Sequence, residues 1–300
     1  MNRRFSMLLM TWALVFMAKV SLAVQLPGPL VEGDWLLAHQ KDPGLVLLDI
    51  QERPTYLRHH IPGSVNLPYS RWRTGPESKR PASLPPLQRL AERLGALGIT
   101  RDTPVVIVTT GQGAGDMAAA ARAYWSLDVL GHEQKAVLDG GLISYVKRFG
   151  GRFAAGPPPK RQPARYEPIP RPELLATKDQ LARGVDQPLL DARSVEEHLG
   201  LVAPPGDRPG TIPGAHNLPF DWLVGQDGRL RPREQIRKLF AFAGIHQGGA
   251  VHFCHTGNRA ALTWFADRAL LGNQKARLYD GSMMEWAKDS RLPVERKLDL

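Results

Sequence analysis

The chain has 300 residues, of which 43% are hydrophobic, and a formal net charge of +10. This length and this apolar content are enough for one or two ordinary globular cores and exclude a disordered chain. The positive charge suits small anionic substrates. Because the sequence holds no lysine-rich run and no basic helix with interleaved aromatic residues, we expect no nucleic acid partner.

The N-terminus has the composition of a secretory signal. Met1-Asn2-Arg3-Arg4 is followed by an apolar stretch over residues 5–18 and by Ser21-Leu22-Ala23, whose small residues suit signal peptidase. An apolar run of about a dozen residues is shorter than the roughly 20 that span a bilayer, although an uncleaved anchor is the alternative. We therefore expect residues 1–23 to be a signal peptide, with export to a bacterial periplasm and no stable membrane insertion after cleavage.

A long internal repeat follows the signal. Four segments match in the same order: residues 47–49 with 189–191, 60–69 with 211–220, 105–109 with 250–254, and 138–141 with 279–282. A repeat of this length indicates two domains rather than a solenoid. We expect these domains at residues 24–155 and 173–300, joined by a semi-rigid, proline-rich linker at residues 156–172.

Each copy has the pattern of an α/β domain. Short runs rich in leucine and β-branched residues alternate with longer amphipathic stretches, such as residues 87–97, 117–130 and 233–243. This alternation predicts a mainly parallel central sheet flanked by helices. The Ile-Pro-Gly turn in each copy needs the fixed φ of proline beside the freedom of glycine, so we assign it a structural role.

Thr109 in the first copy stands where Cys254 stands in the second. The loop after Thr109, residues 110–116, is longer than its counterpart and rich in glycine. Its glycine spacing lacks the third glycine of a dinucleotide motif and it has no Rossmann context, so we expect no nucleotide cofactor.

Cys254 is the only cysteine, and it lies between an apolar run at residues 250–253 and a predicted helix at residues 260–271. Residues 254–259 therefore form a tight strand-to-helix loop. Its backbone N–H groups, the helix dipole and Arg259 all favour a thiolate at Cys254. A buried, inert cysteine is the alternative. Exported proteins mostly use cysteines in pairs, so a single thiol favours a chemical role.

Together these segments resemble the tandem-domain rhodanese family of sulfurtransferases, in an exported bacterial form. The resemblance covers nearly the whole mature chain and includes the Asp-Gly-Ser-x-x-x-Trp motif at residues 280–286. It implies that the second domain is catalytic and that the first, with Thr109 in place of cysteine, is degenerate. The first domain would then supply one wall of the active-site cleft.

The resemblance also implies a mechanism. The thiolate of Cys254 would take the outer sulfur from a small anionic donor and pass it, from a persulfide, to cyanide or a thiol. The backbone of the loop would cradle the persulfide as an anion hole does. The loop residues are His255, Thr256, Gly257, Asn258 and Arg259.

Three side chains are candidates for substrate binding. Arg259 would bind the donor and stabilise the thiolate, unless it is a solvent-facing residue at the helix start. His255 would contact the substrate or be a plain exposed loop residue. The family carries an arginine after the Leu-Leu-Asp motif, which gives Arg193 here, although Glu196 and Glu197 follow it.

The choice of donor stays open at this point. The loop matches neither the very basic loop of thiosulfate-specific members nor the uncharged loop of mercaptopyruvate-specific ones. Arg259 favours thiosulfate, with 3-mercaptopyruvate as the alternative. Thr211 also replaces the histidine that precedes Ile-Pro-Gly in the family, whereas His60 keeps it in the first copy.

A phosphatase, a sulfur carrier and a metal site are the alternatives for this loop. Dual-specificity phosphatases place five residues between cysteine and arginine, whereas this loop has a smaller cradle, with one residue fewer. A periplasmic sulfur carrier with little turnover of small molecules would need the same loop. His252, Cys254 and His255 do not complete a tetrahedral site, so we expect no metal and no cofactor, and we expect His252 to be a core histidine.

Overall fold

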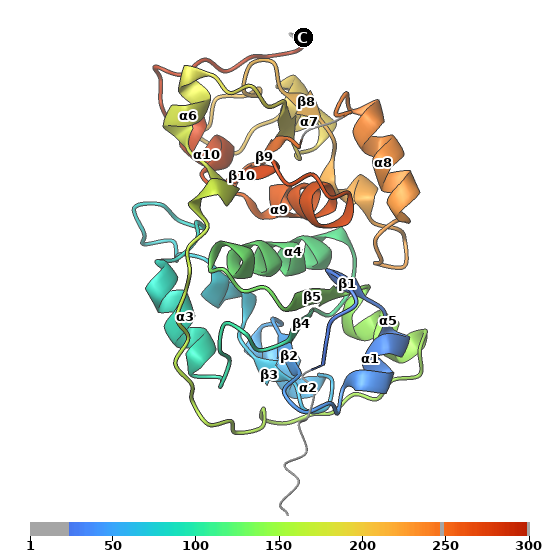
Figure 1. Cartoon of the computed structure of the whole chain (residues 1–300). Coiled ribbons are helices and arrows are strands. Elements are labelled where there is room, and N and C mark those ends of the chain that lie inside the picture. Colours follow the sequence, from blue (N-terminus) through green and yellow to red (C-terminus); the bar gives the residue numbers. More distant parts are fainter. Residues whose placement is uncertain (1–23, 247–248, 299–300) are drawn as a thin grey trace, which may run out of the picture.

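The computed structural model describes residues 24–246 and 249–298. The predicted signal peptide, residues 1–23, lies outside the described residues. Two parallel sheets, each with helices on its faces, lie one above the other with a helical layer between them (Figure 1). This arrangement confirms the predicted α/β class.

The two sheets have the same topology, as the sequence repeat predicts. The first has the order β1-β5-β4-β2-β3 and the second the order β6-β10-β9-β7-β8, and every strand pair is parallel. The strands of the first sheet are β1 (Leu30–Val31), β2 (Val46–Asp49), β3 (Val65–Asn66), β4 (Val105–Val108) and β5 (Lys135–Leu138). Those of the second are β6 (Leu175–Ala176), β7 (Leu189–Asp191), β8 (His216–Asn217), β9 (Val251–Phe253) and β10 (Arg277–Tyr279).

Helices cover both faces of each sheet. The first domain has α1 (Gly33–His39), α2 (Arg53–Arg58), the 3-10 helix η1 (Tyr69–Trp72), α3 (Leu87–Gly95), α4 (Ala114–Val129) and α5 (Gly141–Lys147). The second has η2 (Pro172–Leu174), α6 (Lys178–Arg183), α7 (Val195–Leu199), η3 (Phe220–Leu223), α8 (Arg233–Phe242), α9 (Asn258–Trp264), the π-helical η4 (Phe265–Leu270) and α10 (Ser282–Trp286). All residues of β2 and β4 are buried, as expected of central parallel strands covered on both sides.

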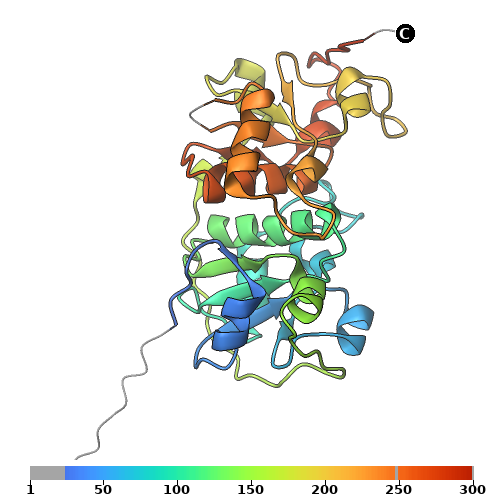
Figure 2. The ribbon, with the colours of Figure 1, turned by 90° about the vertical axis from the view of Figure 1, so that its right-hand side faces the viewer.

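Helix α4 explains how the two domains join. It lies between the sheets and beside α9 in both ribbon views (Figure 1 and Figure 2). An ordinary surface helix has one polar face, but most of α4 is buried because it contacts its own sheet on one side and the second domain on the other. The second domain therefore rests on the first through these two helices.

The interface also contains a reciprocal pair of hydrogen bonds that follows the repeat. The N–H of Leu84 in the first domain donates to Asp280 of the second at 2.8 Å. The N–H of Leu230 in the second domain donates to Asp139 of the first at 2.9 Å. Asp139 and Asp280 are matched positions of the repeat. Each domain therefore accepts a backbone hydrogen bond from the other at the equivalent aspartate.

The linker is fixed along its length to the first domain. Its Ala164 N–H donates to the Gly95 carbonyl at 2.8 Å and its Ile169 N–H to the Leu130 carbonyl at 2.9 Å. Near its end, Arg171 pairs with Asp128 of α4 at 2.9 Å. None of the helices within the described residues combines the length and the apolar character that crossing a bilayer requires.

Candidate active site

Cys254 follows β9 at the carboxyl edge of the second sheet and is only 1% exposed. Its N–H donates to the hydroxyl of Ser282 at 3.1 Å, and its carbonyl accepts from Met283 N–H at 3.0 Å. Ser282 has a φ of 51°, a left-handed conformation that residues other than glycine rarely adopt, and Gly141 fills the matched position in the first domain. The hydroxyl that binds the Cys254 N–H accounts for a serine at this strained position.

The loop after Cys254 turns through Gly257 into α9. Gly257 has a φ of 75°, and a Cβ there would lie 2.5 Å from Arg122 Nη1 and 3.0 Å from the Asp280 carbonyl oxygen. No residue with a side chain fits that space. The turn starts α9 at Asn258, two residues before the predicted helix start, so Asn258 and Arg259 belong to the first helical turn.

Two carbonyls of the loop are bound by arginines of the first domain, and its N–H groups have no acceptor among the described residues. Arg73 donates to the Thr256 carbonyl at 3.3 Å, and Arg122 donates to the Gly257 carbonyl at 3.2 Å. Among the residues that the structure describes, none accepts a hydrogen bond from the N–H groups of residues 255–259. Successive free N–H groups in a tight turn form an anion-binding concavity.

The matched loop of the first domain is already filled. The N–H groups of Gly111 and Gln112 donate to the carboxylate of Asp116 at 2.9 and 3.0 Å. A glycine hairpin of the second domain also covers this loop, so closely that a Cβ on Gly228 would lie 2.5 Å from the Gly111 carbonyl oxygen. An internal carboxylate thus takes the place that an external anion would need.

We predict that Thr109→Cys does not create a second sulfur-carrying site, because Asp116 repels an anion there and already accepts from the loop N–H groups. The measurement is intact-protein mass after incubation with thiosulfate, in a background where Cys254 is alanine. No added sulfur atom is expected. Addition of one sulfur to Cys at position 109 would contradict this account of the loop.

The first domain forms one wall around the cysteine loop, as predicted. The hydroxyl of Tyr69, at the start of η1, donates to the side-chain oxygen of Asn258. Arg122 on α4 is completely buried, pairs with Asp280 at 2.5 Å and lies with its guanidinium 4.5 Å from the ring centre of Trp125. The loop of the second domain is therefore held by side chains of the first.

Arg259 is bound by a carboxylate instead of facing solvent. Its two terminal nitrogens contact the two carboxylate oxygens of Glu197 at 2.5 and 2.8 Å. Burial alone would lower the pKa of Arg259, but Glu197 and the nearby Cys254 raise it above its usual range. Burial alone would raise the pKa of Glu197, but Arg259 lowers it overall. Both groups are charged at neutral pH, and Glu197 neutralises much of the positive charge of Arg259.

Arg193 lies below the loop and is 2% exposed. Its Nε and Nη2 bind the carboxylate of Asp191, and Nη2 also donates to the Gly210 carbonyl at 2.8 Å. Asp191 further accepts from Thr211 and contacts His198. Burial would raise the pKa of Asp191, but His198 and Arg193 lower it to about 2. The contacts of Arg193 with Asp191 and Gly210 are structural, and the substrate contact expected of Arg193 stays a prediction.

His255 lies at the edge of the site with its side chain 21% exposed. Its Nδ1 is 3.5 Å from Asp207, and its pKa is lowered, first by burial and then by the positive charge of Arg259, against the opposing effect of Asp207. A neutral imidazole at this edge fits either of the two roles considered for it. No group of three or more His, Cys, Asp or Glu side chains that could hold a metal occurs in the described part of the chain.

His252 is a core histidine, as predicted. It is completely buried, and its two ring nitrogens lie 3.0 Å from Thr263 and 3.0 Å from Asp267.

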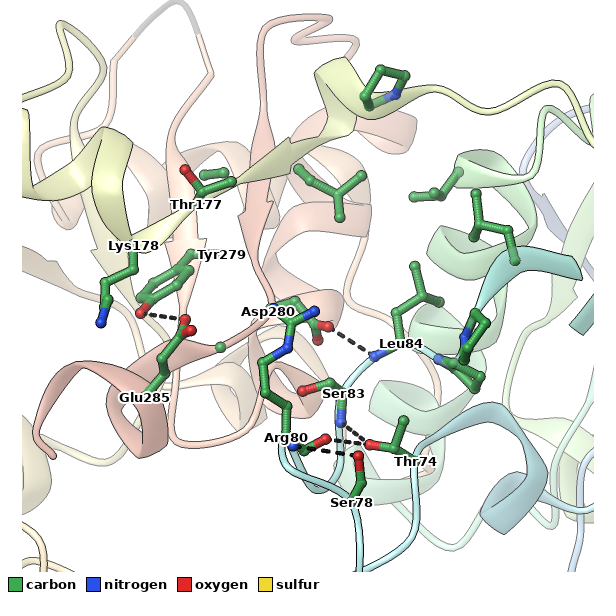
Figure 3. A pocket seen from close by; sticks show the side chains of 18 of the residues that line it. Thr74, Ser78, Arg80, Ser83, Leu84, Thr177, Lys178, Tyr279, Asp280 and Glu285 are labelled. Atoms are coloured by element: carbon green, nitrogen blue, oxygen red, sulfur yellow. Dashed lines mark hydrogen bonds between the residues drawn. The ribbon is translucent and has the colours of Figure 1, made fainter. Parts of the chain in front are cut away.

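A pocket of about 800 Å³ opens between the domains beside this site (Figure 3). Leu84 and Arg80 of the first domain face Asp280 and Tyr279 of the second across it. Cys254 does not line the pocket, although Asp280, which pairs with Arg122 beside the loop, does. The candidate site is therefore the loop after Cys254 and not this pocket.

The sequence did not point to Tyr69, Arg73 or Arg122, nor to the pairing of Glu197 with Arg259. Two of them could have been found from the sequence, Tyr69 by comparing the two copies and Arg122 by its apolar neighbours. Tyr69 matches Phe220, so only the first copy has a hydroxyl at that position. Arg122 is the only charged residue in an otherwise apolar stretch of α4, residues 117–127, which marks it as a buried cation with a partner.

Comparison with known proteins agrees with the repeat. Residues 32–148 and 175–289 match the family described as "Rhodanese-like domain". "Putative thiosulfate sulfurtransferase 1" of Mycobacterium bovis is 30% identical over 277 residues, which cover 89% of this chain and 97% of that protein. A protein of Mycobacterium leprae named in the same way is 32% identical over 281 residues, which cover 89% and 91%.

Solved structures show the same two-domain arrangement. A variant of EanB with a cysteine persulfide, in a complex with ergothioneine, superposes with a TM-score of 0.79 at 25% identity and covers 90% of this chain and 71% of that one. The anaerobic ergothioneine biosynthesis enzyme from Chlorobium limicola, bound to trimethyl histidine, gives 0.78 at 25% identity, with coverage of 90% and 71%.

Proposed function

Because the chain belongs to the rhodanese family and is a tandem-domain sulfurtransferase, we propose that Cys254 carries a sulfane sulfur from thiosulfate to cyanide or a thiol. One observation carries this proposal. The N–H groups after Cys254 have no acceptor among the described residues, whereas those after Thr109 donate to Asp116. A site for one anionic sulfur is therefore open only where a cysteine is present.

The proposed transfer has two steps. The Cys254 thiolate attacks the outer sulfur of thiosulfate, a sulfur–sulfur bond forms to the cysteine, and the bond to the sulfonate breaks as its electron pair leaves with sulfite. The acceptor then attacks the outer sulfur of the persulfide. With cyanide, the products are thiocyanate and the regenerated thiolate, so charge and atoms balance in both steps.

The residues of the loop have distinct roles in this scheme. Backbone N–H groups of residues 255–259 and the start of α9 hold the persulfide anion. Arg259 opposes the carboxylate of Glu197, which would otherwise repel the sulfur, and the role predicted for it in donor binding stays part of the proposal. The cysteine persulfide of EanB and the names of the mycobacterial relatives support the same chemistry here.

The test is steady-state thiocyanate formation by the purified protein. We expect multiple turnovers with thiosulfate and cyanide, and slower turnover with 3-mercaptopyruvate. Faster turnover with 3-mercaptopyruvate would reassign the donor. Loading of one sulfur without turnover would make the protein a carrier, and hydrolysis of an aryl phosphate without thiocyanate would contradict the proposal.

We also propose that the transfer takes place in the periplasm, which rests only on the composition of residues 1–23. Recovery of the protein with cytoplasmic markers after osmotic shock would contradict this location.

A further inference from the structure

Four arginines surround the cysteine loop, and they differ in how their charge is balanced. Three form ion pairs with carboxylates: Arg122 with Asp280, Arg193 with Asp191, and Arg259 with Glu197. The fourth is Arg73 of the first domain. No carboxylate among the residues that the structure describes forms an ion pair with Arg73.

Arg73 is held by carbonyl oxygens alone. Its Nε donates to the Ala82 carbonyl at 3.0 Å and its Nη2 to the Thr256 carbonyl at 3.3 Å. These neutral acceptors fix the plane of the guanidinium but do not cancel its positive charge. Because Arg73 is only partly buried, an anion from solvent can reach it.

Arg73 also lies against the cysteine loop and beside Tyr69, which contacts the same loop. Its guanidinium is 5.8 Å from the ring centre of Tyr69, whose hydroxyl donates to Asn258 of the loop. The pKa of Tyr69 is raised, first by burial; Arg73 lowers it and Cys254 raises it. Arg73 and Cys254 are thus both near enough to Tyr69 to influence the pKa of its hydroxyl.

We propose that Arg73, contributed by the non-catalytic domain, binds the sulfonate end of thiosulfate and thereby selects an anionic donor. This inference rests on the proposed function. When the outer sulfur of thiosulfate meets Cys254 inside the loop, its sulfonate would stay at the mouth of the loop, beside the first-domain side chains that contact the loop. A guanidinium matches two oxygens of an oxyanion and stays charged at every relevant pH.

The assignment gives the degenerate domain a role in specificity. The carboxylates beside the three paired arginines would repel the thiosulfate dianion. Arg73 is therefore the arginine best suited to bind it. The same contact would hold sulfite before it leaves. A donor without an oxyanion would gain nothing from Arg73.

The experiment compares Arg73→Ala and Arg73→Gln with a matched control, Arg71→Ala. Arg71 is an exposed neighbour on η1, so its loss removes the same charge from the surface without touching the loop. Arg73→Gln keeps a neutral amide donor on a polar side chain and removes the charge. It serves as the test if Arg73→Ala does not fold.

We expect the KM for thiosulfate to rise about tenfold in both Arg73 variants, and inhibition by sulfite to weaken by a similar factor. With an alkyl hydropersulfide as donor, which carries no oxyanion and passes its outer sulfur to Cys254 as the alkyl thiolate leaves, the rates should stay within about twofold of wild type. Arg71→Ala should resemble wild type with both donors.

The outcomes separate this inference from the proposed function. A wild-type protein without thiosulfate turnover overturns the proposed function and this inference with it. An active wild type with an unchanged KM in the Arg73 variants overturns the inference alone. An equal loss with thiosulfate and with the hydropersulfide also overturns it, because Arg73 would then act by holding the Thr256 carbonyl and not by binding the donor.

Discussion

Replacing Cys254 with serine is expected to abolish sulfur transfer and to leave the fold unchanged. A hydroxyl of similar size fits the buried site, but it stays protonated at neutral pH and is a far weaker nucleophile than a thiolate. The chain has no second cysteine that could carry the sulfur instead. Loss of a catalytic nucleophile costs several orders of magnitude in other enzymes, so we expect thiocyanate formation to fall by at least about a thousandfold.

The control for this prediction is the folded state. The variant should unfold at nearly the same temperature as wild type, because it keeps the backbone hydrogen bonds that Ser282 and Met283 make with residue 254. Its intact mass should show no added sulfur after thiosulfate treatment. Residual turnover above one tenth of wild type would mean that another group carries the sulfur.

Local signals in the sequence were enough to predict the fold. Helix α8 starts at Arg233, where the amphipathic pattern begins, and strand β9 matches the apolar run before Cys254. These elements follow from hydrophobic periodicity, which depends only on neighbours along the chain. The start of α9 was predicted two residues too late, because the left-handed Gly257 allows the helix to begin directly after the turn.

The wall of the site could not be predicted in the same way. Tyr69 and its partner Asn258 are 189 positions apart, and Arg73 and Thr256 are 183 positions apart. Such contacts depend on how the two domains dock, and a sequence of residue types does not state which carboxylate or carbonyl an arginine will meet. The same holds within one domain. Arg259 and Glu197 form an ion pair, but nothing in the sequence indicated that these two residues contact each other.

The repeat shows how one substitution changes the chemistry of a shared position. Asp191 pairs with Arg193, and its pKa is lowered to about 2. The matched Asp49 has Gln51 in place of the arginine, and burial, opposed only by hydrogen bonds from Gln51, raises its pKa to about 7. The fold of the two domains is the same, but at these matched positions only the second domain has an ion pair of aspartate and arginine.

Replacing Arg259 with alanine is expected to lower the catalytic efficiency with thiosulfate by roughly a hundredfold. The variant loses a positive charge beside the loop and leaves the half-buried carboxylate of Glu197 without its partner. That carboxylate then repels both the thiolate and the anionic donor. The rate of alkylation of Cys254 at neutral pH should fall in the same variant, because less of the thiol is ionised.

A double variant separates the two causes. Glu197→Gln alone should keep the activity close to wild type, because Arg259 stays in place. Combined with Arg259→Ala, it removes the unpaired carboxylate, and we expect the efficiency to return to within about tenfold of wild type, a non-additive result typical of residues in contact. A double variant as slow as Arg259→Ala would instead show that the arginine acts on the donor directly, as the sequence predicted. Wild-type efficiency in Arg259→Ala itself would leave the backbone of residues 255–259 as the sole support for the sulfur anion.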